Sequence, residues 1–340
     1  MANKYEEATM IKVIQYGVGV LGKAVAQILG NKVGIKIVGA LDVDKEKLGR
    51  DIGEIAGLGK PLGVLVSDNP ERLFMETKAD MAIHTVTSKF EDAYPQIAQA
   101  IEHGLDVVTS AEEFCNPFAL DHERSARLQN LAVENGATVL GTGVRPGFLG
   151  DYLTLAVTGV CAKIEKIESW THLDLRPALV SPEVAKHFGV GLTHDEFAKK
   201  VNDGIVTGPT GMPQQIELVA DRLGWKLDEV RTIFDPIVAE DGIVSGYKMV
   251  AEGVIDLRTR IVIEHRGSVN PQEQSSEGVK IVGWPDVNIV ISPGITGIEA
   301  TAARCVNVIP HVLKAKPGIM TPADLPLVWA LADHVGPEGA

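Results

Sequence analysis

Met10-Ile-Lys-Val-Ile-Gln-Tyr16 is an apolar, β-branched run that passes directly into Gly17-Val-Gly19-Val-Leu-Gly22. The next residues, Lys23-Ala-Val-Ala-Gln-Ile-Leu29, place apolar side chains at helical spacing. The pattern predicts a strand, a tight turn and a helix, which is the arrangement that holds a dinucleotide pyrophosphate at a helix N-terminus. The alternative is an ordinary strand-turn-helix connection, because a chain with 35 glycines can match G-x-G-x-x-G by chance.

Each glycine of this motif has a separate physical task. Gly17 lets the chain turn, Gly19 lets backbone N–H groups approach phosphate oxygens, and Gly22 lets the helix pack closely on the strand. A second expected strand, 33–41, ends at Asp42, where the motif places an acid for the adenosine ribose hydroxyls. The cofactor-binding residues predicted here are Gly17, Val18, Gly19, Val20, Leu21, Gly22 and Asp42.

The composition excludes several classes of protein. The net charge of −13 argues against a nucleic-acid partner, because nucleic-acid binders carry a basic face. No apolar run approaches the roughly 20 residues of a membrane span, and the N-terminus lacks the features of a signal peptide, so we expect a cytoplasmic protein with no membrane partner. Cys115, Cys161 and Cys305 fit neither a disulfide framework nor a metal site, so we expect reduced thiols and no metal.

From Met10 to about Gly143 the predicted strands and helices alternate, which indicates a Rossmann-like, doubly wound parallel sheet of the α/β class. The strand 79–86 delivers Thr85 and Thr87 to the carboxyl edge of that sheet, where ligands bind. Their hydroxyls are candidate cofactor contacts, but they can equally be strand formers and caps of the next helix. We also expect helical residues at 44–56, a strand at 62–66 and one helix over 119–135.

Two carboxylates follow the next expected strand, 105–109. Glu112 and Glu113 stand in Thr109-Ser-Ala-Glu-Glu-Phe-Cys115, just past the carboxyl edge and in otherwise apolar company. Desolvation raises the pKa of a carboxyl group, which is the condition for general acid-base catalysis near neutral pH. The alternative is that both glutamates occupy the first turn of a helix continuing to Phe118, where the helix dipole favours them.

A second glycine-rich turn, 141–147, ends the parallel run. Its backbone at Gly143 can pass close to a nicotinamide ring, or the turn can be a flexible exit from the domain. The pattern changes after it, so we divide the chain into a dinucleotide-binding domain (1–147), a substrate-binding and dimerisation domain (148–293) and a C-terminal segment (294–340).

The second domain is predicted to be α+β with a largely antiparallel sheet. Residues 162–175 and 253–266 alternate apolar and polar side chains, and 279–291 is again β in character. Helices that cover one face of such a sheet leave the other free, so we expect a homodimer through that face. The final helix, 298–315, is expected to return to the first domain, whose parallel sheet has two faces to cover. The other expected helices are 152–161, 182–188, 195–202 and 213–223.

Absent motifs narrow the chemistry of the two glutamates. The chain contains no H-E-x-x-H metal motif, no Ser-Tyr-x-x-x-Lys of the short-chain dehydrogenases and no Glu-Lys-Pro of the two-domain sugar oxidoreductases. Where those sugar enzymes place a lysine after this strand, the present chain has Glu112 and Glu113. An acid suits a reaction in which a nitrogen must lose a proton or an ammonium must be held.

Motifs along the whole chain resemble those of the 2,4-diaminopentanoate dehydrogenases and the related native amine dehydrogenases. They are Gln15-Tyr-Gly-Val-Gly19, Leu41-Asp-Val-Asp44, Thr109-Ser-Ala-Glu-Glu113, Gly141-Thr-Gly-Val-Arg-Pro-Gly147, and Ala300-Thr-Ala-Ala-Arg-Cys-Val-Asn307 with Pro310 and Pro317-Gly318. The resemblance implies a dihydrodipicolinate reductase-like N-terminal domain and an NAD(P)-dependent oxidoreductase acting on CH–NH2 groups. Such an enzyme deaminates an amine or diamino acid, and in reverse aminates a ketone or aldehyde with ammonia.

The resemblance also implies roles for particular residues. The family's catalytic glutamate carries over onto Glu112, with Glu113 as its rival. The position that is asparagine in the family's second glycine turn is Arg145 here, which can bind a substrate carboxylate or point outward. Histidines and aromatic residues more often pack in cores than line pockets, but the candidate pocket walls are Arg145, Phe148, Tyr152, Trp170 and His172.

The sequence fits more than one cofactor and more than one reaction. Asp42 would hydrogen-bond a ribose diol and repel a 2′-phosphate, which favours NAD. Lys45, Lys47 and Arg50 can reach a phosphate, which allows NADP, although such a charge run is usually a solvated helix face. Two other functions stay open: reduction of a carbon–nitrogen double bond in a cyclic substrate, as in dihydrodipicolinate reductase, and non-catalytic dinucleotide sensing.

Overall fold

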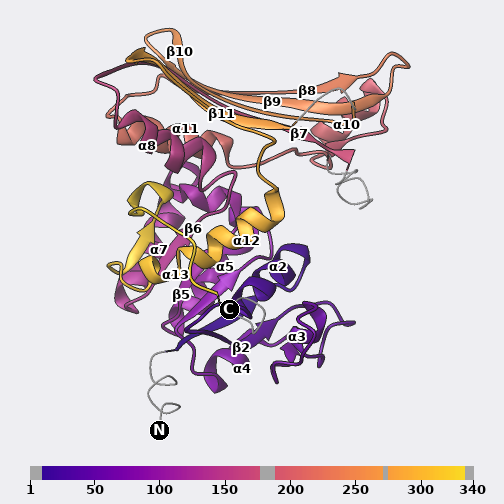
Figure 1. Cartoon of the computed structure of the whole chain (residues 1–340), viewed down its shortest axis with the longest axis vertical. Helices are drawn as coiled ribbons and strands as arrows, with labels where there is room; N and C mark the ends of the chain where they lie inside the picture. The colour runs from indigo at the N-terminus through magenta and orange to yellow at the C-terminus, as the bar shows by residue number, and fades with distance from the viewer. Residues whose placement is uncertain (1–9, 177–187, 271–274, 334–340) are drawn as a thin grey trace, which may run out of the picture. The chain divides into compact units, whose positions relative to one another are not determined.

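The structure, a computed structural model, describes residues 10–176, 188–270 and 275–333. The chain divides into two compact units, Met1–Gly147 with Thr296–Ala340, and Phe148–Ile295. Each unit has its own sheet (Figure 1). The helix predicted at 182–188 lies almost entirely outside the described residues.

The first unit is built on a seven-stranded sheet in the order β13-β6-β5-β4-β1-β2-β3, with every neighbouring pair parallel. This confirms the predicted Rossmann-like sheet. The strand order reverses between β1 and β4, and a doubly wound sheet binds its ligand at the carboxyl edge of that point. The strands are β1 (Ile11–Tyr16), β2 (Ile35–Leu41), β3 (Val66–Ser67), β4 (Met81–His84), β5 (Asp106–Thr109), β6 (Thr138–Gly141) and β13 (Gly318–Met320).

Helices cover both faces of this sheet. Phe90 and Ile97 of α5 and Leu128 of α7 pack in one core with strand residues. Alternate strand residues such as Val13 and Leu140 are fully buried on the other face. There α12 packs against α2 (Figure 1), which confirms the predicted return of the C-terminal helix. The helical elements are α2 (Val20–Leu29), α3 (Ile52–Ile55), α4 (Pro70–Glu76), α5 (Phe90–Glu102), η1 (Glu112–Cys115), α6 (Pro117–Leu120), α7 (His122–Glu134), α12 (Gly297–Asn307), α13 (Ile309–Val312) and η4 (Pro322–Asp324).

Several predicted elements of the first unit are wrong in extent, because local hydrogen bonds compete with the helix or strand. The predicted strand 62–66 shrinks to β3, since the backbone N–H groups of 62–64 donate to the buried carboxylate of Asp51 instead of a neighbouring strand. The predicted helix 119–135 restarts at Asp121, whose carboxylate accepts from Arg124 N and caps α7. The predicted helix 298–315 is interrupted between α12 and α13, because Pro310, in the first turn of α13, has no N–H to donate to the preceding turn.

The second unit is built on a six-stranded sheet in the order β12-β11-β7-β10-β9-β8. Only β7 and β10 pair in parallel, so the predicted largely antiparallel sheet is confirmed. One face packs against α8 and α11 through Val157 and Ile216 (Figure 1). The elements are η2 (Leu149–Leu153), α8 (Thr154–Thr158), β7 (Lys163–Asp174), α10 (His194–Asn202), α11 (Met212–Arg222), β8 (Glu229–Val238), β9 (Val244–Ile255), β10 (Arg258–Ser268), β11 (Ser276–Trp284) and β12 (Val287–Ile291).

Two of the predicted strands are hairpins. The alternating run 253–266 contains a two-residue turn at Asp256 and Leu257, whose φ angles of 51° and 61° lie in the left-handed region. The run 279–291 likewise turns between β11 and β12. A two-residue turn hardly disturbs a period-two pattern, so alternation predicted the strands but not where they reverse. Strand β8 was not predicted from the sequence.

Candidate functional site

The glycine turn lines a cavity of about 430 Å³ at the carboxyl edge of β1, β2 and β4. This volume falls within the range of small-molecule sites in proteins. The cavity brings together residues that are far apart in the sequence, among them Tyr16, Gly17, Gly19, Asp42, Thr85 and Gln96.

Each of the three glycines of the G-x-G-x-x-G turn has the surroundings expected for its role. A Cβ on Gly22 would lie 1.9 Å from the carbonyl oxygen of Gly17, so only glycine permits this close approach of α2 to the turn. Gly17 adopts a φ of 90°, a conformation that favours glycine. A Cβ on Gly19 would meet no atom within 4 Å. The space before α2 is therefore open, and this cradle fits the pyrophosphate of a dinucleotide.

Asp42 holds the glycine turn as well as lining the cavity. Its Oδ2 accepts from Val18 N at 2.7 Å, and its Oδ1 accepts from Asp44 N at 2.9 Å. Burial alone would raise the pKa of this carboxyl, but the two backbone hydrogen bonds and the Lys47 ammonium outweigh it and hold the pKa below its usual range. Asp42 is therefore ionised where a ribose diol would bind.

Lys47 lies 3.1 Å from Asp42 Oδ2 and 3.2 Å from Asp44 Oδ2. The interpretation of this charge run as a solvated helix face is wrong for Lys47, whose side chain is only 18% exposed. Residues 45–49 form turns instead of the predicted helix, and the turn directs Lys47 back toward Asp42. Lys45 and Arg50 are exposed.

The two candidate threonines differ in role. The Thr85 hydroxyl donates to Gly17 O at 3.0 Å and accepts from Gln15 Nε2 at 2.8 Å, so it stabilises the turn beside the cavity. The Thr87 hydroxyl accepts from Lys89 N at 3.3 Å, in the residues just before α5, and does not cap the helix itself. Gln15 was not singled out from the sequence, although a glutamine inside an apolar strand was a usable signal.

The two glutamates open a single 3₁₀ turn, η1, at the end of β5. The helix expected to continue to Phe118 is broken at Asn116, whose φ and ψ of −152° and 76° are not helical. Glu113 Oε2 accepts from Phe90 N at 2.6 Å, at the start of α5. The carboxylate of Glu113 thus helps to satisfy the N-terminus of a helix. Both glutamates are partly buried.

His84 is a buried polar residue between the cavity and η1 that the sequence analysis missed. Its Nε2 lies 2.8 Å from Gln96 Oε1 and its Nδ1 lies 3.0 Å from Thr109 Oγ1. Burial lowers the pKa of the imidazole to about 4, because desolvation disfavours the charged ring. His84 is therefore neutral near pH 7. The signal in the sequence was a lone histidine ending the buried run Met81-Ala-Ile-His84.

The second glycine turn packs against α12. Val144 N donates to Thr301 Oγ1 at 3.3 Å, and a Cβ on Gly143 would lie 3.3 Å from Thr301 Cγ2. The Arg145 guanidinium lies beside Gly297, at the start of α12. The turn is thus a buried, packed segment rather than a loose exit from the unit.

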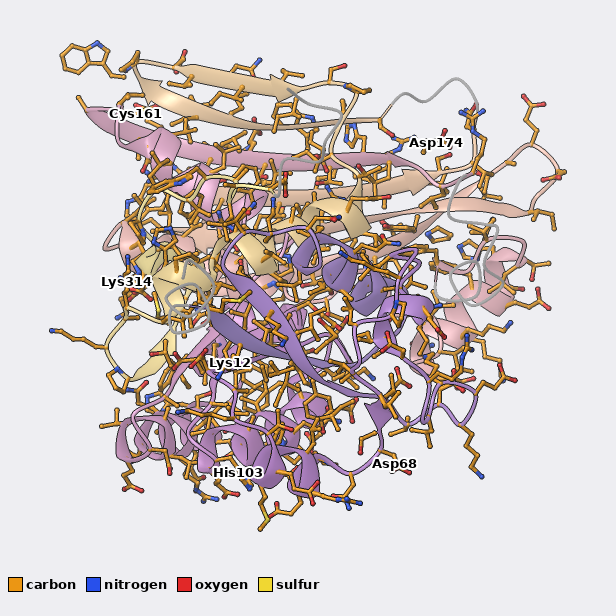
Figure 2. The ribbon with its side chains drawn as sticks, turned by 60° about the horizontal axis from the view of Figure 1, so that its bottom comes forward. Lys12, Asp68, His103, Cys161, Asp174 and Lys314 are labelled. Carbon is orange, nitrogen blue, oxygen red and sulfur yellow. The ribbon has the colours of Figure 1, made fainter. Side chains whose placement is uncertain are left out.

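Four of the predicted pocket-wall residues belong to the second unit, in two places. The rings of Phe148 and Tyr152 stack with centroids 6.2 Å apart. Trp170 and His172 lie on β7, which runs from near Cys161 to Asp174 (Figure 2). Their side chains alternate with the buried Ser169 and Thr171, so they occupy the sheet face that α8 and α11 leave open.

On that open face the two β7 residues contact other strands. The His172 Nε2 lies 2.9 Å from Glu264 Oε1, and Lys248 Nζ lies 3.0 Å from Glu264 Oε2. The Trp170 indole lies over Gly278, where a Cβ would be 2.3 Å from the ring. The structure therefore does not bring Trp170 and His172 together with Phe148 and Tyr152 on one face of the sheet.

Residues 10–176, 188–270 and 275–333 hold no group of three or more His, Cys, Asp or Glu side chains suited to a metal ion. None of the helices within these ranges combines the length and apolar character needed to cross a membrane.

Known families match both parts of the chain. The family described as "2,4-diaminopentanoate dehydrogenase C-terminal domain" matches residues 148–337, and the family described as "Dihydrodipicolinate reductase, N-terminus" matches residues 11–138. The 2,4-diaminopentanoate dehydrogenase of Acetoanaerobium sticklandii is 32% identical over 94% of this chain and 95% of its own. The amine dehydrogenase of Streptomyces virginiae is 24% identical over 94% of this chain and 97% of its own.

Solved structures agree with these matches. The amine dehydrogenase from Mycobacterium smegmatis superimposes with a TM-score of 0.82 at 30% identity, over 94% of this chain and 97% of that one. A dihydrodipicolinate reductase from Paenisporosarcina sp. TG-14 superimposes with a TM-score of 0.55 at 13% identity, over 93% of this chain, which shows a shared fold.

The depressed pKa of His84 predicts a pH-dependent stability. Burial places the pKa at about 4 in the folded protein, against about 6.5 for an ordinary histidine. Between these pH values the unfolded chain binds a proton that the folded chain does not, so His84 makes the free energy of unfolding fall by roughly 3 kcal/mol as the pH drops. Denaturant titrations from pH 7 to 4 should show this loss in the wild type and not in His84→Asn; parallel curves would contradict it.

Proposed function

We propose that this chain, which belongs to the 2,4-diaminopentanoate dehydrogenase family, catalyses the reversible, NAD(P)-dependent oxidative deamination of a small amine or diamino acid. In the synthetic direction, a ketone or aldehyde and ammonia give the amine. The observation that carries the proposal is the position of η1, the turn that bears Glu112 and Glu113. It lies at the carboxyl edge of the same parallel sheet whose glycine turn leaves open space for a pyrophosphate. The three cysteines are free thiols, which fits the reducing cytoplasm in which we place the enzyme.

Different residues of the first unit would bind the cofactor and transfer the proton. The backbone from Gly17 to Gly22 would hold the pyrophosphate, and Asp42 the ribose hydroxyls. A bound nicotinamide supplies the hydride acceptor for amine oxidation and the hydride donor for the reverse reaction. We assign proton transfer to Glu112 as general base and acid, since general acid-base groups in enzymes are worth roughly 10²–10⁴-fold in rate.

In the synthetic direction, the Glu112 carboxylate would take a proton from ammonium, so that neutral ammonia attacks the carbonyl carbon. The resulting carbinolamine loses its hydroxyl as water when Glu112 returns the proton to that oxygen. The carboxylate, ionised again, then stabilises the iminium cation electrostatically. Deamination uses the same groups in reverse order.

Glu113 is the rival for this role, and its contact with α5 argues for Glu112. The Glu113 carboxylate accepts from Phe90 N at 2.6 Å, and this contact holds it at the N-terminus of α5. We therefore propose that Glu113 orients η1 and that Glu112 exchanges the proton.

Two other functions have less support. A 4-hydroxy-tetrahydrodipicolinate reductase of Sinorhizobium medicae is 28% identical to this chain, but over only 40% of it. Residues 148–337 instead match the C-terminal domain of the 2,4-diaminopentanoate dehydrogenases. A dinucleotide sensor would need the cavity but not the two glutamates of η1. Both functions predict no turnover of amines with NAD or NADP.

Substitution of the two glutamates tests the assignment. Glu112→Gln removes the proton-exchanging group and should lower kcat for amine oxidation by about 100-fold or more, without changing the Kd for NADH measured by fluorescence. Glu113→Gln is the matched control, because it keeps the size of the side chain and should affect thermal stability more than kcat. If activity survives in Glu112→Gln and disappears in Glu113→Gln, the two roles are exchanged.

For the cofactor we propose a preference for NAD. Asp42 and Asp68 both line the cavity, and two carboxylates disfavour a 2′-phosphate. Lys47 is drawn toward Asp42 and partly neutralises it, so NADP remains usable.

The variant Asp42→Asn should reduce the ratio of kcat/KM for NAD to that for NADP by about tenfold, corresponding to about 1.4 kcal/mol. The reason is that the substitution removes a charge that repels the phosphate and leaves Lys47 paired with Asp44 instead of two carboxylates. Asp44→Asn is the control, because Asp44 also pairs with Lys47 but is not among the cavity residues. An unchanged ratio in Asp42→Asn would contradict the preference.

We also propose a homodimer through the open face of the six-stranded sheet. One row of residues crosses all six strands on that face, and it is mostly apolar: Val290, Gly278, Trp170, Glu264, Val250 and Ile233. Val290 and Ile233 are 56% and 46% exposed in the single chain. A broad apolar row on a sheet face is suited to pairing with the same row of a second copy.

Light scattering at micromolar concentration should give twice the mass of one chain. Ile233→Asp and Val290→Asp should each reduce it to the single-chain mass, because each places a charge in the buried row. Leu257→Asp, at the fully exposed tip of the β9–β10 hairpin, should leave the dimer intact. A monomeric wild type would refute the interface.

A further inference from the structure

Four adjacent strands of the parallel sheet end in one row of residues. Tyr16, His84, Thr109 and Gly141 are paired in register on β1, β4, β5 and β6. Residues in register on parallel strands point to the same face, so the row is continuous. It begins at the cofactor cavity, which Tyr16 lines. It ends under η1, where a Cβ on Gly141 would lie 2.2 Å from Phe114 O.

Within this row, His84 makes one hydrogen bond to Gln96 of α5 and one to Thr109, its neighbour on β5. An amide oxygen only accepts, so the contact with Gln96 Oε1 requires the hydrogen on Nε2. In the neutral ring Nδ1 is then an acceptor, and it receives the Thr109 hydroxyl hydrogen at 3.0 Å. The Thr109 oxygen in turn accepts from Ala111 N at 3.1 Å. Ala111 immediately precedes Glu112.

Both ends of this chain of bonds belong to the functional site. Gln96 and Tyr16 line the cavity, and the Tyr16 ring packs edge-on against the imidazole with centroids 5.3 Å apart. The other end, Ala111, is the residue that immediately precedes η1. A buried imidazole is costly unless both of its nitrogens are paired. An apolar side chain would fill the space without orienting the Thr109 hydroxyl.

We propose that His84 is a positioning residue: through Thr109 and Ala111 it sets the start of η1, and with it the place of Glu112 relative to the cofactor cavity. The inference rests on the proposed function for the role of Glu112. Nδ1 of the neutral His84 ring can only accept, so the hydrogen of the Thr109 hydroxyl points toward it. The Thr109 oxygen is then oriented to accept from Ala111 N. The part of the ring that matters for η1 is thus Nδ1, whereas Nε2 contacts Gln96, a residue that lines the cavity.

Two amide substitutions separate these two parts of the ring. The amide of His84→Asn lies near the place of Nδ1 and can accept from Thr109, but it does not reach Gln96. The amide of His84→Gln lies near the place of Nε2 and keeps the bond to Gln96, but it leaves Thr109 without its acceptor. Thr109→Val and Thr109→Ser form a second pair, which removes or keeps the hydroxyl and remains informative if a His84 variant does not fold.

Amide hydrogen exchange of the peptide 110–116, measured without substrate, reads the position of η1 directly. We expect exchange about tenfold faster in His84→Gln and Thr109→Val, the scale of one lost hydrogen bond, and exchange near that of the wild type in His84→Asn and Thr109→Ser. In amine oxidation, kcat should fall about tenfold in the first two variants, with the KM for NAD changed less than about twofold. Thermal melting checks that each variant is folded.

The outcomes separate this inference from the proposed function. Wild-type exchange in both His84→Gln and Thr109→Val would overturn the positioning role. Equal losses in His84→Asn and His84→Gln would also overturn it, because the ring would then act only by filling space. If the wild type deaminates no amine, the proposed function fails, while the exchange data still decide whether His84 sets η1.

Discussion

A Cβ on Gly22 would lie 1.9 Å from the carbonyl oxygen of Gly17, and the geometry of the candidate site depends on this close approach of helix α2 to the turn after β1. Three side chains hold the turn. Gln15 donates to Gly17 O, the Thr85 hydroxyl donates to the same oxygen, and Asp42 accepts from Val18 N. A Cβ on Gly19 would meet no atom within 4 Å, so the space before α2 stays open.

The parallel sheet connects the glycine turn with the turn that bears Glu112. Its strands are in register at their carboxyl ends, so the residue that ends each strand lies beside the residue that ends the next. The row from Tyr16 to Gly141 is a consequence of that register. It links a cavity suited to a nucleotide with the turn that bears Glu112, over strands that are far apart in the sequence. His84 stays neutral in this row because burial lowers its pKa to about 4.

The second unit uses its sheet differently. Helices α8 and α11 bury one face through Val157 and Ile216. The opposite face combines ion pairs such as Lys248–Glu264 with half-exposed apolar residues. Trp170 and His172 were expected to wall a substrate pocket, but the two-residue alternation of β7 puts them on this open face. The same residues therefore fit the dimer interface that we propose better than a pocket in one chain.

The sequence by itself determined the parallel sheet and its glycine turn, because β-branched runs, helical spacing and glycines act through short-range sterics that any chain of this pattern obeys. It also placed Asp42, Thr85 and the two glutamates at strand ends. Only the tertiary structure decided what these side chains contact. Glu113 caps a helix more than twenty residues away in sequence, Lys47 folds back on Asp42, and His84 spans two elements. Such contacts depend on which strands become neighbours, and no local pattern in the chain encodes that.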